Sequence, residues 1–449
     1  MESNQVKKTV SLLFGVLAIL GLLSFLPAFT IGNWKLRPIH ILADIQEDPP
    51  SQPTPVVAMP DSLLTPRAVD QPDTCELSIP CIEDYSANRQ ALAKFFKALR
   101  NSRQQPVRIA FFGDSFIEGD ILTAPLRDTL QQVFGGRGVG FVPIASEVAQ
   151  YRTSILHQYN NWETRSIVGK YDDEPVFGTP GFVFTPGTDN WVEYKPGKGS
   201  RRFSSMQLFY NCSLEQPVTL AVNDTLHIAE VLTPEEGIQR LRIALPAASS
   251  VRMTLPADSA VFYGVSFEEG TGVYVDNFAM RGNSGMGLLR INQSMHRMFN
   301  QYRDYKLIIL QYGLNVVGEN DSTNYEGYAR RMVTVIERLQ TAFPESSILL
   351  VSISDRSSNQ EGTFKTIPAI PMMRDAQRHM ALKTGIAFWD LYEAMGGENS
   401  MVQYATATPT LAAKDYTHLT FRGGRIIAMK LAKALLHDQK RYENNRKPR

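Results

Sequence analysis

Short apolar runs alternate with segments of helical periodicity through much of the chain. The first run covers residues 107–112, and comparable runs lie at 273–280, 307–312, 348–353 and 386–391. Before, between and after these runs, apolar side chains recur every three or four residues, which predicts helices over 84–99, 116–134, 288–299, 325–343, 374–384 and 421–436. Continuous apolar strands that alternate with helices are typical of a parallel sheet covered on both faces. The pattern therefore predicts an α/β domain.

Residues 145–267 have a different pattern. Short alternating or β-branched runs, such as 206–210 and 218–222, are separated by Gly, Pro, Asn and Asp. Several strands at such spacing are typical of an all-β sandwich or jelly roll, which we interpret as a domain inserted into the α/β domain. Its aromatic residues Trp162, Trp191 and Tyr194 either stack on sugar faces or fill the core of the inserted domain.

The N-terminus predicts a membrane anchor. Lys7 and Lys8 precede an uncharged, mostly apolar stretch over 9–34, and a spanning helix needs roughly 20 such residues. A cleavable signal peptide has a shorter apolar core and a small-residue cleavage site, for which 27–30 is a poor candidate. We therefore expect residues 1–34 to be a cytoplasmic stub and an uncleaved transmembrane signal anchor, with the rest of the chain on the periplasmic or extracellular side of a bacterial-type cytoplasmic membrane.

The remaining boundaries follow from composition. Prolines concentrated in 35–83 predict an extended linker, the α/β domain takes 84–144 and 268–440, and 441–449 is a basic tail. The 46 Lys and Arg balance 45 Asp and Glu, so no bulk attraction to nucleic acid is implied. Of the three cysteines, Cys75 and Cys81 are close enough in sequence to close a small loop in an oxidising compartment, although two free thiols remain the alternative.

No cofactor is predicted. The glycine-rich run at 135–142 lacks both the Gly-Lys-Ser/Thr ending of a phosphate loop and the preceding strand of a dinucleotide site. We interpret it as a helix end followed by a sharp turn. His and Cys never cluster at the spacing of a zinc site, so no metal is expected either.

Candidate chemistry begins where the first apolar run ends, at Gly113-Asp114-Ser115. A serine between a buried parallel strand and a helix lies at the carboxyl edge of the sheet, where open α/β folds bind ligands. Its backbone N–H then lies near a helix start, which favours developing negative charge. The alternative is a plain turn in which Asp114 or Ser115 caps the helix.

A second candidate lies before the final predicted helix. Asp415 and His418 are three residues apart, so the carboxylate can reach the imidazole Nδ1–H while Nε2 points outward. The alternative is that Asp415 or Thr420 caps the helix and His418 is an ordinary surface residue.

Hydrolysis of an ester needs a nucleophile, a base, a group that orients the base, and donors for the oxyanion. Ser115, His418 and Asp415 fit the first three roles. The oxyanion donors would be the backbone N–H groups of Ser115 and Gly285 and the side-chain amide of Asn315, which follow separate strands. Asp114 would support the serine turn. Gly282 is an alternative to Gly285, which we prefer because a serine precedes it.

Gly113-Asp114-Ser115-Phe116, the Gly285 turn, Gly313-Leu314-Asn315 and Asp415-Tyr416-Thr417-His418 resemble, in order, the four motif blocks of SGNH/GDSL hydrolases. The resemblance covers most of 107–436 outside the β-rich block and implies a flavodoxin-like, three-layer fold. Phe116 and Val316 depart from the residues that often follow the serine and the asparagine, which affects the expected substrate preference more than the reaction.

With its β insertion and N-terminal anchor, the chain is similar to the peptidoglycan and polysaccharide O-acetylesterase branch of these hydrolases. This resemblance implies an esterase that removes O-acetyl groups from a glycan, with no metal or organic cofactor. An O-acetyltransferase that receives acyl groups from a membrane acyltransferase partner would use the same residues. The third interpretation is a glycan-binding protein with a vestigial site.

Overall fold

The computed structural model describes residues 29–31, 34–36, 79–197, 202–255, 260–319 and 324–445. The chain forms two compact units, Met1–Asp70 and Gln71–Arg449. In the first, strands β1 (Phe29–Ile31) and β2 (Trp34–Leu36) pair as an antiparallel hairpin. The two residues between them in sequence, Gly32 and Asn33, are a pair that favours hairpin turns.

The predicted membrane helix is therefore wrong at its end, because Phe29–Ile31 and Trp34 belong to strands. The rest of that prediction, residues 1–28, lies outside the described residues. In the part of the chain that the structure describes, no helix is both long and apolar enough to cross a membrane.

A six-stranded sheet forms the centre of the second unit. Its order is β14-β4-β15-β16-β19-β3, and the strands are β3 (Ile82–Asp84), β4 (Pro106–Gly113), β14 (Gly272–Ala279), β15 (Tyr305–Gln311), β16 (Ser347–Val351) and β19 (Ala387–Trp389). Strands β14, β4, β15, β16 and β19 are parallel to one another, and β3 pairs antiparallel with β19 at the edge of the sheet. Because these five strands run in one direction, the loops that follow them meet at one edge of the sheet.

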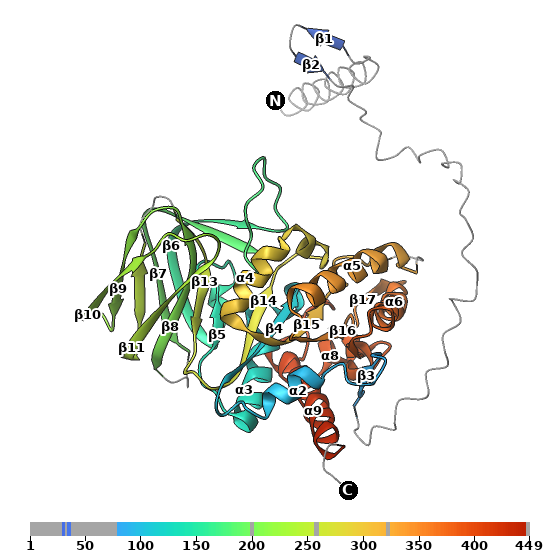
Figure 1. The fold of residues 1–449 in the computed structure, drawn as a ribbon. Coiled ribbons are helices and arrows are strands. Elements are labelled where there is room, and N and C mark those ends of the chain that lie inside the picture. Colours follow the sequence, from blue (N-terminus) through green and yellow to red (C-terminus); the bar gives the residue numbers. More distant parts are fainter. Residues whose placement is uncertain are drawn as a thin grey trace, which may run out of the picture. The chain divides into compact units, whose positions relative to one another are not determined.

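Helices cover both faces of this sheet, as Figure 1 shows. One face carries α2 (Ala93–Leu99), α3 (Thr123–Phe134) and α9 (Phe421–Asn444), and the other carries α4 (Gln293–Arg303), α5 (Glu326–Ala342) and α6 (Ala369–Thr384). The short helices α7 (Leu391–Met395) and α8 (Ser400–Thr406) lie between α6 and α9 in sequence. This arrangement is the three-layer α/β fold expected from the sequence.

Most of the predicted helices differ from the prediction by more than one residue at an end: α3 begins at Thr123 rather than residue 116, α4 covers Gln293–Arg303 rather than 288–299, α6 begins at Ala369 rather than residue 374, and the first and last helices also differ. The first helix begins at Ala93 rather than residue 84, because Asp84 ends β3 and accepts hydrogen bonds from the backbone N–H groups of Ser86 and Ala91. The last helix continues to Asn444, so the predicted basic tail is helical at its start. Its end is held by an ion pair between Glu443 and Arg100 at 2.8 Å.

The β-rich block forms a nine-stranded antiparallel sheet that begins at Gly140, before the predicted boundary at residue 145. All nine strands are hydrogen-bonded into one sheet, in which the long strand β7 pairs with β6, β12 and β13. The strands are β5 (Gly140–Val142), β6 (Ile155–Ser166), β7 (Phe182–Pro196), β8 (Phe203–Cys212), β9 (Gln216–Val222), β10 (Leu226–Leu232), β11 (Gln239–Ala248), β12 (Val251–Thr254) and β13 (Ala260–Phe267). They enclose a hydrophobic core separate from the core of the α/β layers.

Tyr194 belongs to this second core and is fully buried, so it does not offer a face to a sugar. Trp162 is half-buried and packs edge-on against Phe262, with its indole N–H donating to the Trp191 carbonyl at 3.1 Å. Of the three aromatic residues named from the sequence, Tyr194 is therefore a core residue, whereas Trp162 and Trp191 are partly exposed.

Buried ion pairs join the β-rich block to the parallel sheet. Glu268, directly after β13, binds Arg108 of β4 and Arg303 of α4, both at 2.6 Å. Arg303 also binds Asp276 of β14 at 2.5 Å. Since an unpaired charge at such depth is strongly destabilising, these partners fix how the two sheets sit against each other.

The structure also describes two of the three cysteines and the glycine-rich run at 135–142. Cys81 is disulfide-bonded and Cys212 is free and buried, while Cys75 lies outside the described residues. Gly135 ends α3, and a Cβ on Gly136 would come within 2.7 Å of the Val273 backbone nitrogen. The first part of the run is the helix end and sharp turn that the sequence predicted, and its last three residues form β5.

Candidate active site

Ser115 follows β4 at the edge where the parallel strands end. It opens a 3₁₀ turn, η2 (Ser115–Asp120), which kinks at Glu118 and Gly119. The helix that the sequence placed directly after the serine therefore begins only at Thr123. Ser115 keeps its backbone N–H without a hydrogen-bond partner in the described part of the chain, as expected for the first residue of a helical turn.

Asp114 and Gly113 hold this turn. Asp114 Oδ1 accepts a hydrogen bond from the Phe116 N–H at 2.9 Å, so Asp114 is the cap that the sequence offered as the alternative to catalysis. A Cβ on Gly113 would lie 2.8 Å from the Ile117 side chain, so glycine allows the close approach. The capping of the turn leaves the Ser115 hydroxyl available for chemistry.

Local hydrogen bonds also shape the loop of Asp415 and His418. Asp415 Oδ1 accepts from the backbone N–H groups of Thr417 at 3.0 Å and His418 at 3.1 Å. Thr420, rather than Asp415, caps α9 by accepting from the Gly423 N–H at 3.3 Å. Asp415 Oδ2 therefore remains available to the imidazole.

The two loops meet in one hydrogen-bond chain. Asp415 Oδ2 lies 2.7 Å from His418 Nδ1, and His418 Nε2 lies 3.0 Å from Ser115 Oγ. A carboxylate only accepts hydrogen bonds, so Nδ1 carries the proton and Nε2 accepts from the serine hydroxyl. This is the arrangement in which imidazole acts as a general base toward a serine.

Asn315 connects to the serine turn through Asp114. Its Nδ2 donates to Asp114 Oδ2 at 3.0 Å and to the Asn283 carbonyl at 3.3 Å. The amide therefore lies on the same hydrogen-bond network as the serine turn, with one short bond and one longer bond. The longer bond is the one that an oxyanion would most readily replace.

The Gly285 N–H donates to Asn283 Oδ1 at 2.9 Å. An oxyanion would therefore have to share or replace that hydrogen bond. The sequence did not show that the Gly285 N–H already has a partner. Gly285 has φ +89°, and a Cβ would come within 2.8 Å of Met332. Gly282, the alternative donor, lies on the exposed side of the same turn with nothing near its Cβ position.

Asn283 was not predicted as a site residue. It is buried, its side chain fixes the Gly285 N–H, and its carbonyl accepts from Asn315. An asparagine two residues before a glycine is the signal of an Asx turn, so the pattern that identifies it was present in the sequence.

The pKa values of Asp114 and Asp415 are shifted in opposite directions. Burial raises the pKa of Asp114 to about 6, against the opposing effects of the Phe116 N–H, the His418 charge and the Asn315 amide. Partial burial also acts to raise the pKa of Asp415, but its hydrogen bonds from His418 and Thr417 outweigh burial and hold the pKa below its usual range. Asp415 is therefore the group that keeps its negative charge beside the imidazole.

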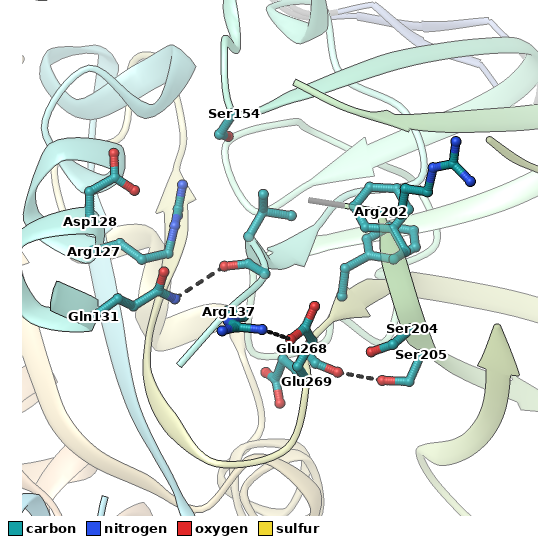
Figure 2. Close-up of a pocket in the computed structure, with 14 residues that line it drawn as sticks. Arg127, Asp128, Gln131, Arg137, Ser154, Arg202, Ser204, Ser205, Glu268 and Glu269 are labelled. Atoms are coloured by element: carbon teal, nitrogen blue, oxygen red, sulfur yellow. Dashed lines mark hydrogen bonds and ion pairs between the residues drawn. The ribbon is translucent and has the colours of Figure 1, made fainter. Parts of the chain in front are cut away.

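A cavity of about 360 Å³ lies between α3 and the β-rich block, and Figure 2 shows it. Arg127 and Gln131 of α3 line one side, and Ser204 and Ser205 line another. Arg137 pairs with Glu269 at 3.7 Å across it. None of the predicted site residues lines this cavity, so it is distinct from the surroundings of Ser115. Among the described residues, no group of three or more His, Cys, Asp or Glu is placed to hold a metal ion.

No protein-family model matches the sequence, and no curated protein matches it. Among solved structures, a peptidoglycan O-acetylesterase aligns with 80% of this chain and 99% of its own, at 22% identity and a TM-score of 0.67. An acetyl xylan esterase aligns with 36% of this chain and 80% of its own, at 18% identity and a TM-score of 0.28. A family two carbohydrate esterase from Cellvibrio japonicus aligns with 63% of this chain and 99% of its own, at 8% identity and a TM-score of 0.26.

Of these three structures, the peptidoglycan O-acetylesterase has the highest TM-score. Its alignment spans nearly the whole of the solved structure, so this protein has the fold of the peptidoglycan O-acetylesterase. The fold predicted from the SGNH/GDSL motifs is confirmed.

Proposed function

We propose that this protein is a serine esterase that removes O-acetyl groups from a cell-wall or extracellular glycan. The observation that carries the proposal is the continuous hydrogen-bond chain from Ser115 Oγ through His418 to Asp415. The acetylated glycan is proposed because the fold is that of a peptidoglycan O-acetylesterase.

In the first half of the reaction, Ser115 Oγ attacks the ester carbonyl while His418 Nε2 takes the hydroxyl proton. Asp415 stabilises the imidazolium that forms, because its carboxylate is held 2.7 Å from Nδ1. The Ser115 N–H and the Asn315 amide hold the tetrahedral oxyanion. The Gly285 N–H joins them when its hydrogen bond to Asn283 Oδ1 is shared with or replaced by the oxyanion. His418 then gives its proton to the glycan oxygen as the bond from the carbonyl carbon to that oxygen breaks, so the glycan departs with a free hydroxyl and acetyl-Ser115 remains.

In the second half, water replaces the glycan. His418 Nε2 takes a proton from the water as its oxygen attacks the acetyl carbonyl, and the same donors hold the second oxyanion. Collapse of that intermediate returns the proton to Ser115 Oγ and releases acetate. Each role is filled by a side chain or backbone group of this chain.

We also propose that the catalytic unit lies outside the cytoplasmic membrane. The uncharged, mostly apolar residues 9–28, which follow two lysines, support an anchor, and the disulfide at Cys81 supports an oxidising compartment. Alkylation of intact cells with a membrane-impermeant thiol reagent tests this location: a cysteine substituted for exposed Glu361 should be labelled without lysis. Labelling only after lysis would contradict it.

The decisive experiment measures acetate release from an aryl acetate and from O-acetylated peptidoglycan by the wild-type protein and Ser115→Ala. We expect the variant to lose all measurable turnover and to unfold at the same temperature, because the substitution removes one partly exposed hydroxyl. Retained turnover in Ser115→Ala would refute the proposal. Acetyl transfer to a glycan hydroxyl in place of acetate release would identify a transferase, and glycan binding without any turnover would identify a vestigial site.

A further inference from the structure

A groove runs along the edge of the β-rich sheet. Strand β6 pairs with β7 and with no other strand of the described chain, so one of its edges is an edge of the sheet (Figure 1). The segment 146–150 lies along that edge and, together with β6, lines a groove of about 560 Å³. Leu156 and Gln158 of β6 are exposed at the groove.

The groove leads toward the serine turn. It shares Ser146, Ala149 and His157 with a smaller cavity of about 50 Å³, which Gly119 and Asn277 also line. Gly119 belongs to the turn that Ser115 opens, and the Asn277 amide donates to the Ile117 carbonyl in that turn at 2.8 Å. A chain bound in the groove would therefore extend toward the catalytic edge.

The lining combines aromatic rings with uncharged amides. Trp191 and Tyr159 supply rings, and the exposed side chains of Gln150 and Gln158 supply donors and acceptors. The Arg252 guanidinium lies 4.0 Å from the centre of the Trp191 ring and holds that ring in place. Rings that pack against C–H groups, together with amides that bind hydroxyls, are the complement of a sugar chain.

The charges of the lining argue against an anionic polymer. Glu147 is its only acidic residue, and it contains no Lys or Arg. His157 is uncharged at neutral pH, because burial lowers its pKa to about 4. A nucleic acid or another polyanion would meet no Lys or Arg among the lining residues, and Arg252 beside the groove is engaged with the Trp191 ring.

The edge strand is also poorly suited to adding a peptide strand. The 146–150 segment lies against the edge near His157, whose Nε2 is 2.8 Å from the Ile144 carbonyl. Further along, the register of β6 shifts between Asn160 and Trp162, which interrupts the row of backbone groups that a peptide would pair with.

We infer that this groove binds an uncharged stretch of the polysaccharide chain that carries the ester. The inference rests on the proposed function and adds to it the place where the polymer is held. It implies that the protein distinguishes polymers from small esters by KM, because a small ester does not reach Trp191.

The test compares an aryl acetate with O-acetylated glycan strands freed of peptides, using the full-length protein and the variants Trp191→Ala and Gln158→Ala. We expect KM for the glycan to rise about tenfold in Trp191→Ala, which loses the ring contact, and a few fold in Gln158→Ala. The kcat/KM for the aryl acetate should stay within about twofold in both, since neither residue contacts the reacting atoms. Leu226→Ala, at an exposed apolar residue on β10, which pairs with β9 and does not line the groove, is the matched control and should change the kinetics of neither substrate.

Trp191→Phe controls for a folding defect. It keeps an aromatic ring, so its KM for the glycan should be close to that of the wild-type protein. The inference would be overturned if Trp191→Ala and Gln158→Ala impaired the aryl acetate as much as the glycan, or if neither variant changed the KM for the glycan. Co-sedimentation of Ser115→Ala with insoluble peptidoglycan separates this inference from the proposed function, because it requires no turnover. Competition by free glycan strands supports the groove as a sugar site, whereas competition by cell-wall peptides alone contradicts it.

Discussion

The serine turn and the Asp415–His418 loop meet in one hydrogen-bond chain, yet they are held in opposite ways. The serine turn is buried on nearly every side, with Asp114, Phe116 and Ile117 almost without exposure. The side chains of Asp415 and His418 are 50% and 40% exposed, and the loop depends on its own short-range hydrogen bonds. The nucleophile is thus positioned by tertiary packing and the base by local turn geometry.

The two aspartates show what this difference does to charge. Asp114 lies in the buried turn and has its pKa raised, whereas Asp415 lies in the exposed loop and has its pKa lowered. A group that must stabilise an imidazolium has to stay ionised, and the exposed loop provides for that. Asp114 is instead a structural acceptor that joins the serine turn to Asn315.

The largest expected effect is that of Asp415→Asn. An amide in place of the carboxylate can turn its N–H toward Nδ1, which favours the tautomer whose Nε2–H faces Ser115. We expect kcat/KM for an aryl acetate to fall by about 10³–10⁴-fold, with only a small fall in the unfolding temperature because the side chain is half exposed. Glu398→Gln removes an exposed carboxylate elsewhere and is the matched control. A loss below about tenfold would mean that the exposed loop does not orient the base.

Asn315→Ala should have the next largest effect. It removes an oxyanion donor, which typically costs about 10²–10³-fold in kcat, with little change in KM. The neighbouring Val316→Ala should change kcat by no more than a few fold, since its side chain has no proposed contact with the oxyanion. Equal losses in the two variants would place the effect in the loop backbone rather than in the amide.

The third prediction concerns stability and pH. The pKa of Asp114 is raised in the folded protein, so the folded state binds its proton more tightly than the unfolded state. The resulting stabilisation is complete below the ordinary aspartate pKa and is lost as pH rises through about 6. Relative to Asp114→Asn, the wild-type protein should lose about 3 kcal/mol of unfolding free energy between about pH 4 and pH 7.

Asp415 should behave with the opposite sign, because its pKa is lowered. Its contribution is present above the ordinary aspartate pKa and is lost as pH falls through the lower folded value. Denaturant unfolding of wild type, Asp114→Asn and Asp415→Asn, followed from pH 7 down to well below the ordinary aspartate pKa, distinguishes the two aspartates. Curves of the same sign for both aspartates would contradict the contrast between the buried turn and the exposed loop.

The smallest effect is expected at Phe364, in the hairpin of β17 (Ser357–Gln360) and β18 (Thr363–Thr366). Its ring stacks on Tyr416 with centroids 3.8 Å apart, which makes it a long-range support of the Asp415–His418 loop. Phe364→Ala should lower kcat by about three- to tenfold, consistent with a ring pair worth about 1 kcal/mol. Phe364→Tyr should retain activity. A loss as large as that of Asp415→Asn would mean that tertiary packing, and not local turn geometry, holds the base.

Much of the fold and of the site follows from local patterns in the sequence. Apolar runs at 107–112, 307–312 and 348–353 are strands because a buried parallel strand must be apolar on both faces. The three-residue spacing of Asp415 and His418 is enough for their hydrogen bond, since both lie in one turn. The pattern also placed Ser115 at the end of a strand, although it missed the short 3₁₀ turn before α3.

Contacts between distant residues were decided by the tertiary structure alone. Ser115 meets His418 across 303 positions because α9, which follows His418, packs against α3, which follows the serine turn, and the apolar pattern does not specify which helices pack together. The same holds for Asn283, which occupies the Gly285 N–H, and for Tyr194, which alternation alone could assign to either face of its strand. Local patterns determine which residues form strands and turns, whereas sheet order and packing determine which of them meet.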